Sequence, residues 1–154
     1  MKVAMLPEVT HDLSRSWRLM LGHELSFDTN RTIEELDDAG FFTLSMENNT
    51  WGEHAAVLLV SRTDLIQAAA VMFDIDQAAV EADHIDDVGR ELCNVLGACC
   101  TKLFGNEMHG FGIGLPQTLS HSELTELFAR GTLLCEFVAT NLAGSPTIRV
   151  IKIH

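Results

Sequence analysis

Basic residues and long apolar runs are both scarce in this chain of 154 residues. It has 10 Lys and Arg side chains against 22 Asp and Glu, a formal net charge of −12. Such a surface repels phosphate backbones and anionic lipid headgroups, so we expect no nucleic-acid binding and no membrane binding. No stretch approaches the ~18 to 20 apolar residues of a membrane span, and the first residues lack the apolar core of a signal peptide. We therefore expect a cytoplasmic protein.

The sequence motifs of several enzyme classes and metal sites are also missing. The four cysteines form no C-x-x-C pair, and no two of the seven histidines stand four residues apart. A zinc site is therefore not indicated, and we expect reduced thiols rather than a disulfide. There is no P-loop, no dinucleotide fingerprint and no G-x-S-x-G elbow. We accordingly expect no metal ion or cofactor held by this protein itself.

The chain does have the composition of an ordinary globular protein, with 47% hydrophobic and 21% charged residues. Its length fits a single domain over residues 1–154. Apolar periodicity predicts helices at 10–22, 64–73, 84–104 and about 120–131, and strands at 42–46, 55–60, 111–116, 132–140 and 147–153. Because the strands come as hairpins, we predict an α+β fold, a mainly antiparallel sheet packed by two or three main helices, one of them long.

Finer predictions concern the ends of these elements. Thr63 or Asp64 is expected to cap the second helix, and Ser120 with Glu123 fits a capping box for the last one. A short strand at 25–28 and an acidic turn at 34–38 are expected between the first helix and the hairpin. These signals predict where the elements begin, and they do not indicate what the protein does.

The predicted long helix has two distinct faces. At about 100° per residue, Asp87, Glu91, Asn94 and Ala98 form one narrow stripe. The apolar residues form a broad face turned away from it, namely Val88, Leu92, Val95, Leu96, Cys99 and Leu103. Glu91 and Asn94 are three residues apart and can act together on one object. From spacing alone, however, such a pair is more often simply a solvated helix surface.

The stretch D-D-V-G-R-E-L-C-N-V-L-G (86–97) resembles the signature helix of the CheC/CheX/FliY phosphatases of bacterial chemotaxis. The mark of that family is E-x-x-N followed by a glycine, here Glu91, Asn94 and Gly97. I-G-L-P (113–116) resembles the strand that follows this helix in CheX-like members, and the element order is similar over about residues 10–153. Arg90 departs from the small residue common at its position, and a second E-x-x-N is missing from the first helix, as in CheX.

The resemblance implies hydrolysis of the aspartyl phosphate of a response regulator such as CheY. Asn94 would hold the attacking water in line with the phosphorus, and Glu91 would pair with a lysine of the partner. Asp87, Arg90 and Ala98 would surround them at the interface. Mg²⁺ is expected on the phosphorylated partner, because this chain offers no obvious metal cage.

The resemblance also implies a homodimer joined through sheet edges, for which a terminal strand such as 147–153 could supply the hydrogen bonds. Two other functions stay open on the same fold. One is a non-catalytic adaptor that binds a response regulator, or a flagellar or receptor protein. The other is a sensor of a small ligand.

Overall fold

The computed structural model describes residues 1–29, 38–48, 51–105, 112–140 and 145–154. Its helices are α1 (Leu6–Leu21), α2 (Arg62–Phe73), α3 (Ala82–Cys99) and α4 (His121–Ala129), with 3₁₀ turns at Val3–Met5, Gln77–Ala79 and Cys100–Phe104. Its strands are β1 (Phe27–Asp28), β2 (Ala39–Asn48), β3 (Gly52–Ser61), β4 (Gly112–Ile113), β5 (Gln117–Leu119), β6 (Gly131–Ala139) and β7 (Thr147–Ile153). None of the described helices is both long and apolar enough to cross a membrane.

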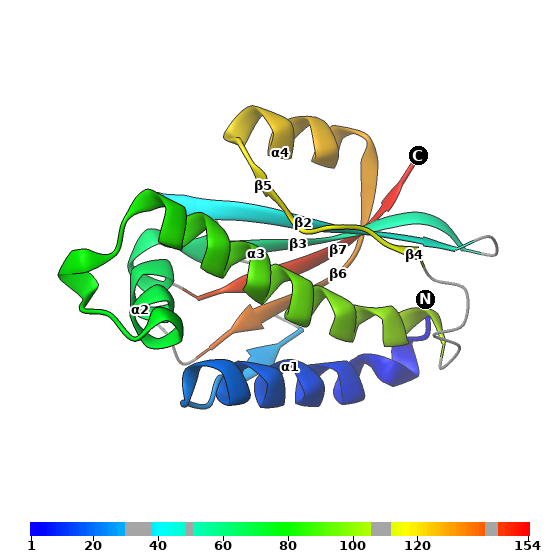
Figure 1. Ribbon diagram of the computed structural model, residues 1–154. Coiled ribbons are helices and arrows are strands. Elements are labelled where there is room, and N and C mark those ends of the chain that lie inside the picture. Colours follow the sequence, from blue (N-terminus) through cyan, green and yellow to red (C-terminus); the bar gives the residue numbers. More distant parts are fainter. Residues whose placement is uncertain (30–37, 49–50, 106–111, 141–144) are drawn as a thin grey trace.

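Within the described residues, the strands form one antiparallel sheet of seven strands, which confirms the predicted α+β fold (Figure 1). The strand order is β1-β6-β7-β3-β2-β4, and β5 also pairs with β2. The expectation that 147–153 offers a free edge is wrong, because β7 is hydrogen-bonded to β3 on one side and to β6 on the other. Its interior place suits its sequence, since Ile148, Val150 and Ile151 are all buried and both faces of the sheet are covered.

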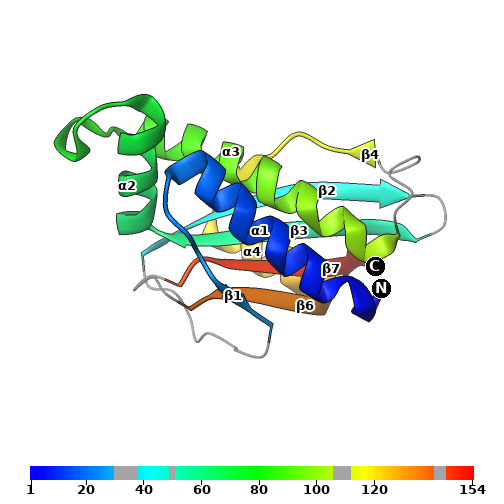
Figure 2. The same cartoon turned by 90° about the horizontal axis from the view of Figure 1, so that it is seen from below.

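Helices cover the two faces of the sheet unequally. α1, α2 and α3 lie on one face, and α4 lies alone on the other (Figures 1 and 2). The larger core lies under the three helices and includes Trp17, Phe42, Leu44 and Leu92. The smaller core lies under α4 and includes Val57 and Leu124. The middle of β3 faces both cores, which explains its unbroken apolar run.

The ends of the first three helices differ in part from the sequence expectation. α1 begins earlier than expected, at Leu6, where Pro7 suits a first turn. It ends at Gly22 as expected, in the left-handed conformation at φ 79°. The cap of α2 is neither Thr63 nor Asp64 but Ser61, whose hydroxyl accepts a hydrogen bond from the backbone N–H of Asp64 at 3.1 Å. The predicted long helix is α3 followed by the 3₁₀ turn, which together reach Phe104.

The region around the last helix also differs in part. The predicted capping box is confirmed, because Ser120 and Glu123 bond to each other's backbone N–H groups. The predicted strand at 111–116 is too long, since β4 holds only Gly112–Ile113 and the ladder resumes at Gln117. Pro116 has no N–H to donate, so this break has a local cause. Phe111 and most of the predicted acidic turn, 34–37, lie outside the described residues.

Candidate functional site

Two glycines fix α3 closely on the sheet. A Cβ atom built on Gly89 would lie 1.9 Å from Cζ of Phe42, and one on Gly97 would lie 2.8 Å from Cδ2 of Leu44. Both neighbours project from β2, and Leu92, between the two glycines, is fully buried. The helix therefore approaches β2 more closely than side chains at these positions would allow, which determines where its outer face lies.

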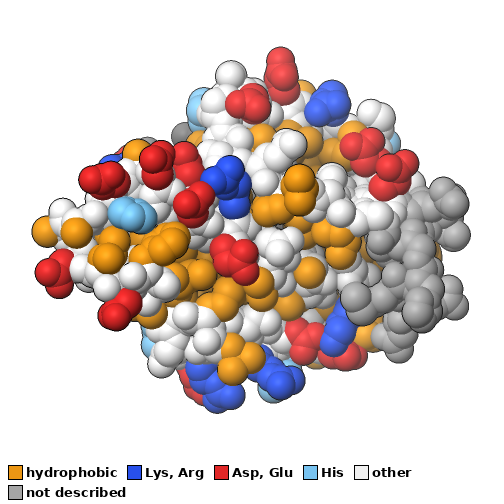
Figure 3. All heavy atoms as spheres, in the orientation of Figure 1, with side chains coloured by type: hydrophobic (Ala, Val, Ile, Leu, Met, Phe, Trp, Pro, Cys, Tyr) orange, Lys and Arg blue, Asp and Glu red, His pale blue; other side chains and the backbone are white. Residues whose placement is uncertain are grey.

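The opposite side of α3 carries the five residues singled out by sequence. Asp87, Arg90 and Glu91 are exposed, whereas Asn94 and Ala98 are half-buried. Figure 3 shows acidic and hydrophobic side chains interspersed over the face of the molecule that α3 crosses in Figure 1. The stripe is thus accessible from outside, while the back of the same helix belongs to the core.

Charges on this side of α3 are arranged unevenly. The guanidinium of Arg90 donates to Oδ1 of Asp87 at 2.6 Å, one helical turn away. Both side chains are about half exposed, so this ion pair adds little to stability but holds the two groups together. Glu91 and Asn94 have no side-chain hydrogen-bond or ion-pair partner among the described residues. Their polar atoms therefore remain available to a group from outside.

An exposed apolar edge runs beside this stripe. α3 packs against β2 and β5, and the segment between β4 and β5 passes alongside it (Figures 1 and 2). In that segment Leu115 is 84% exposed, and the neighbouring Ile113 is 40% exposed. The backbone N–H of Gly114 donates to the carbonyl of Ser45 at 2.9 Å, which ties the segment to β2. Leu115 therefore offers exposed apolar surface at this edge of the sheet.

The side chains of the stripe can act by positioning other groups. A carboxylate only accepts hydrogen bonds and attracts a cation, whereas a carboxamide can both donate to and accept from a water molecule. Within the described ranges, no three His, Cys, Asp or Glu side chains come together as a metal site. Glu91 and Asn94 could accordingly orient a charged group and a water molecule supplied with a partner.

The cysteines of the core are poorly suited to act as nucleophiles. Burial raises the pKa of the Cys93 thiol, on the sheet side of α3, to about 12. Burial likewise raises the pKa of Cys135 to about 12, and it raises the pKa values of Cys99 and Cys100. The thiolate is the reactive form, so these side chains act as packing residues.

Sequence reasoning missed several features of the site. The ion pair between Asp87 and Arg90 has the i,i+3 spacing of opposite charges, a signal that was present in the sequence. The close contact of Gly89 with Phe42 had no such signal, because it joins segments that are distant along the chain.

No protein-family model and no curated protein matches this chain. Among solved structures, it is similar to the chemotaxis protein CheX from Vibrio vulnificus, with a TM-score of 0.71 and 10% identity over 97% of this chain and 100% of that one. It is also similar to a structure of the CheX–CheY–BeF3–Mg²⁺ complex from Borrelia burgdorferi, with a TM-score of 0.63 and 12% identity over 96% and 97% of the chains. A structure of the FliM–SpeE complex from H. pylori gives 0.64 and 9% over 97% and 84%.

These similarities define the class of fold. The chain has the α+β fold of the CheC/CheX proteins over 97% of its length. The same fold occurs in the FliM–SpeE structure, so it serves more than one kind of protein. What this chain does must accordingly be argued from its own residues.

Proposed function

We propose that this chain is a CheX-like member of the CheC/CheX/FliY family that hydrolyses the aspartyl phosphate of a CheY-like response regulator in the cytoplasm. One observation supports this above all. Glu91 and Asn94, which fit the family's E-x-x-N motif, lie on the outer side of a helix that two glycines hold on the sheet, and neither has a side-chain partner among the residues that the structure describes. The fold is that of a CheX that was crystallised with CheY, BeF3 and Mg²⁺.

For hydrolysis, this chain would need to do little more than align the reacting groups. A water oxygen attacks the phosphorus, the bond between phosphorus and the aspartyl oxygen breaks, and phosphate leaves. Phosphoryl transfer of this kind depends mainly on alignment and charge stabilisation. The Asn94 carboxamide can hold the water without repelling the phosphoryl oxygens, which a carboxylate in its place would do. Mg²⁺ would be bound by the regulator.

Glu91 and the residues around it would make the interface. The Glu91 carboxylate would pair with the regulator's lysine, drawing that ammonium group towards α3. Asp87 holds Arg90 in an ion pair, which reduces the repulsion that an unpaired guanidinium would exert on the lysine. Ala98 is small enough to let the regulator approach the C-terminal part of the stripe.

The experiment is phosphate release from a phosphorylated CheY-like regulator of the same organism. Asn94→Ala should slow the release by about 10²-fold or more, as for loss of a group that orients the reacting species. Glu91→Gln should weaken regulator binding, and its effect should shrink as salt rises because screening already weakens the pair. Glu126→Gln on α4, an exposed acid on the opposite face, is the control with the same charge change. If Asn94→Ala folds and hydrolyses at the parental rate, the proposal is wrong.

A non-catalytic adaptor is the second candidate, and the similarity to the FliM–SpeE structure favours it. An adaptor would bind the regulator through α3 and the exposed Leu115 beside it without hydrolysing anything. Binding of the phosphorylated regulator with no phosphate release by the parent protein would support this function. In that case Asn94→Ala should leave binding unchanged.

A homodimer remains a proposal, now placed at a different edge. Among the described residues, β6 pairs on its outer side with only the two-residue β1, at Val138 and Ala139. The rest of that edge, 131–137, can offer hydrogen bonds to a second copy, and Leu133 within it is 54% exposed. Sedimentation that shows only a species of 17.0 kDa at micromolar concentration would contradict the dimer.

A further inference from the structure

Among the described residues, the two most exposed large hydrophobic side chains both lie beside the outer face of α3. They are Leu115, which is 84% exposed, and Leu19, which is 71% exposed. A single exposed leucine is common on protein surfaces and needs no explanation. Here, however, the two leucines lie on opposite sides of the helix that carries Glu91 and Asn94, the polar pair of the candidate site.

Leu115 lies on the β5 side of α3. Its segment runs antiparallel to β2, and Gly114 within it donates its backbone N–H to the carbonyl of Ser45 at 2.9 Å. A Cβ atom built on Gly114 would lie 2.1 Å from Oγ of Ser45, so this backbone is held close to β2. The residue before Ser45 is Leu44, whose side chain lies against Gly97 of α3. Leu115 is therefore level with Gly97, about one helical turn from the polar pair.

Leu19 lies on the other side of α3, on α1. The two helices run antiparallel, and they meet where Oγ of Ser16 lies 3.5 Å from Sγ of Cys99 (Figures 1 and 2). From this contact, Leu19 is one turn further along α1 on the same side, and half-buried Val95 is one turn back along α3. Because the helices are antiparallel, both steps go in the same direction. Leu19 is therefore level with Val95, which follows Asn94 directly.

The polar pair thus lies between two exposed apolar side chains at nearly the same level of α3. In Figure 3, hydrophobic side chains lie both above and below the acidic ones near the middle of this face. Protein interfaces commonly surround a few polar groups with apolar contacts that exclude water when the partner binds. At a site where one water molecule must be aligned, excluding the other water molecules is an advantage.

We propose that Leu19 and Leu115 are the two apolar contacts through which a phosphorylated response regulator docks on α3, one on each side of Asn94. This inference rests on the proposed function and specifies how the partner is held. An α-helix with its side chains is about 10 Å wide, so a single residue of the regulator cannot cover both leucines. The regulator must present apolar side chains on two separate segments beside its phosphorylated aspartate.

Charge favours a regulator over a second copy of this chain on the same face. Each copy has a net charge of −12, and the exposed acids Asp87 and Glu91 lie between the two leucines. A second copy docked through this face would bring the same acids against them, and like charges at an interface oppose binding. A regulator that presents a lysine beside its phosphorylated site is complementary to Glu91.

The test measures affinity and turnover separately. Titration with a regulator carrying BeF3 and Mg²⁺, as in the CheX–CheY structure, gives the affinity, and phosphate release at saturating regulator gives kcat. Leu115→Gln and Leu19→Gln should each weaken binding by about tenfold, because a leucine side chain no longer becomes buried, and should leave kcat unchanged. The two sites are far enough apart for their effects to add, so the double variant should lose about 100-fold.

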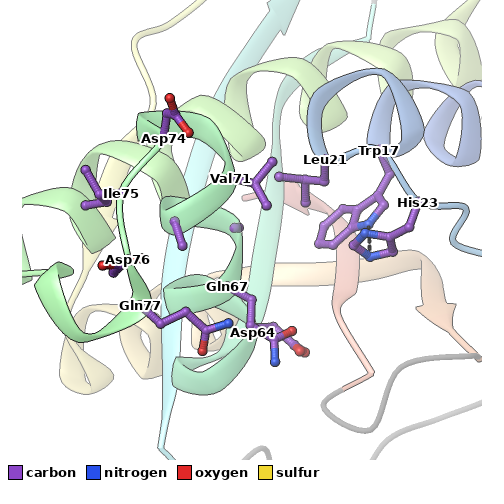
Figure 4. A pocket seen from close by; sticks show the side chains of 12 residues that line it. Trp17, Leu21, His23, Asp64, Gln67, Val71, Asp74, Ile75, Asp76 and Gln77 are labelled. Atoms are coloured by element: carbon purple, nitrogen blue, oxygen red, sulfur yellow. Dashed lines mark hydrogen bonds between the residues drawn. The ribbon is translucent and has the colours of Figure 1, made fainter.

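Matched variants separate loss of apolar surface from any change of side chain. Leu115→Met and Leu19→Met introduce side chains of similar size and shape to glutamine but keep the surface apolar, so they should bind like the parent protein. Val71→Gln is the control outside this surface. Val71 is 55% exposed but lies near Leu21 in the depression between α1 and α2 (Figure 4). It should also bind like the parent.

Several results would overturn the proposal. They are unchanged affinity of Leu115→Gln or Leu19→Gln, an equal loss with the methionine variants, or an equal loss with Val71→Gln. Sedimentation in which the glutamine variants alone lose a dimer would assign the leucines to a second copy instead. All these side chains are exposed, so the variants should fold, and circular dichroism verifies this.

The outcome for the proposed function is distinguishable from these results. If the parent binds the activated regulator but releases no phosphate, hydrolysis is wrong, and the affinities still test the two leucines. If the parent releases phosphate and the glutamine variants bind as tightly as it does, only the present inference is wrong. A parent protein that does not bind the regulator would overturn both.

Discussion

Replacing Gly89 with alanine tests whether α3 is held at its present distance from the sheet. The new methyl carbon would meet three ring atoms of Phe42, at 1.9, 2.2 and 2.4 Å. Ordinary carbon contacts are about 3.5 to 4.0 Å, so the ring or the helix would have to move by more than 1 Å. Phe42 is only 1% exposed and lies in the larger core, where little space exists for the ring to move.

Two opposing effects determine the magnitude. Forcing an extra carbon into a packed core costs about 1 to 3 kcal/mol. Alanine is a better helix former than glycine by about 1 kcal/mol, which offsets part of this loss. Because the clash at Gly89 is with a rigid ring, the upper part of the range applies, and Gly89→Ala should lose about 1 to 2 kcal/mol. For a chain of this size, that lowers the unfolding midpoint by about 2 to 8 °C.

Urea unfolding followed by circular dichroism measures this loss. Gly97→Ala is the matched control, because its methyl carbon would meet Cδ2 of Leu44 at 2.8 Å, the far end of a flexible side chain. It should therefore be less destabilising than Gly89→Ala. Phe42→Leu should remove most of the clash, so the double variant with Gly89→Ala should be more stable than the sum of the single losses predicts. Strict additivity, or a neutral Gly89→Ala, would refute the proposed close contact.

Three further outcomes are expected. Leu92→Ala should lose about 2 to 5 kcal/mol of stability by thermal unfolding, whereas Asn94→Ala should change it by no more than about 0.5 kcal/mol; equal losses would mean that the faces of α3 are misassigned. Burial lowers the pKa of His54, so stability should fall as pH drops below the unfolded value of about 6.5 towards that lowered pKa, and His54→Gln should remove this part of the pH dependence. Cys93 and Cys135 should react with a thiol reagent at pH 8 far more slowly in the folded protein than in urea, and rapid labelling would contradict their burial.

Local signals predicted most of the fold. The alternation at 42–46 and the apolar run at 55–60 correspond to β2 and β3, and the capping box at Ser120 starts α4. These features depend on residues close together in sequence, where periodicity and caps carry the information. Some errors were local, such as the cap of α2 and the break at Pro116, but the error about the sheet edge has a distant cause. That 147–153 lies inside the sheet depends on β6 and β3 flanking it, and no local pattern encodes this.

The candidate site was predictable to a similar extent. The helical period alone put Glu91 and Asn94 on the polar side of α3, where Glu91 is exposed and Asn94 is half-buried. What the sequence did not reveal is how the helix is supported. The contact between Gly89 and Phe42 joins α3 to β2, which are distant along the chain, so it depends on tertiary packing that a single sequence does not display.

The placement of the glycines bears directly on how accurately the polar pair is held. Glu91 and Asn94 lie between Gly89 and Gly97, whose eight-residue separation spans about 12 Å of helix. Close contacts at both ends of this span resist tilting as well as sliding of α3 over β2. Water-positioning chemistry tolerates displacements of only about 0.5 Å, so such support is what the proposed role of Asn94 requires. A helix held at one point alone would pivot, and the carboxamide would then sweep through a range larger than that tolerance.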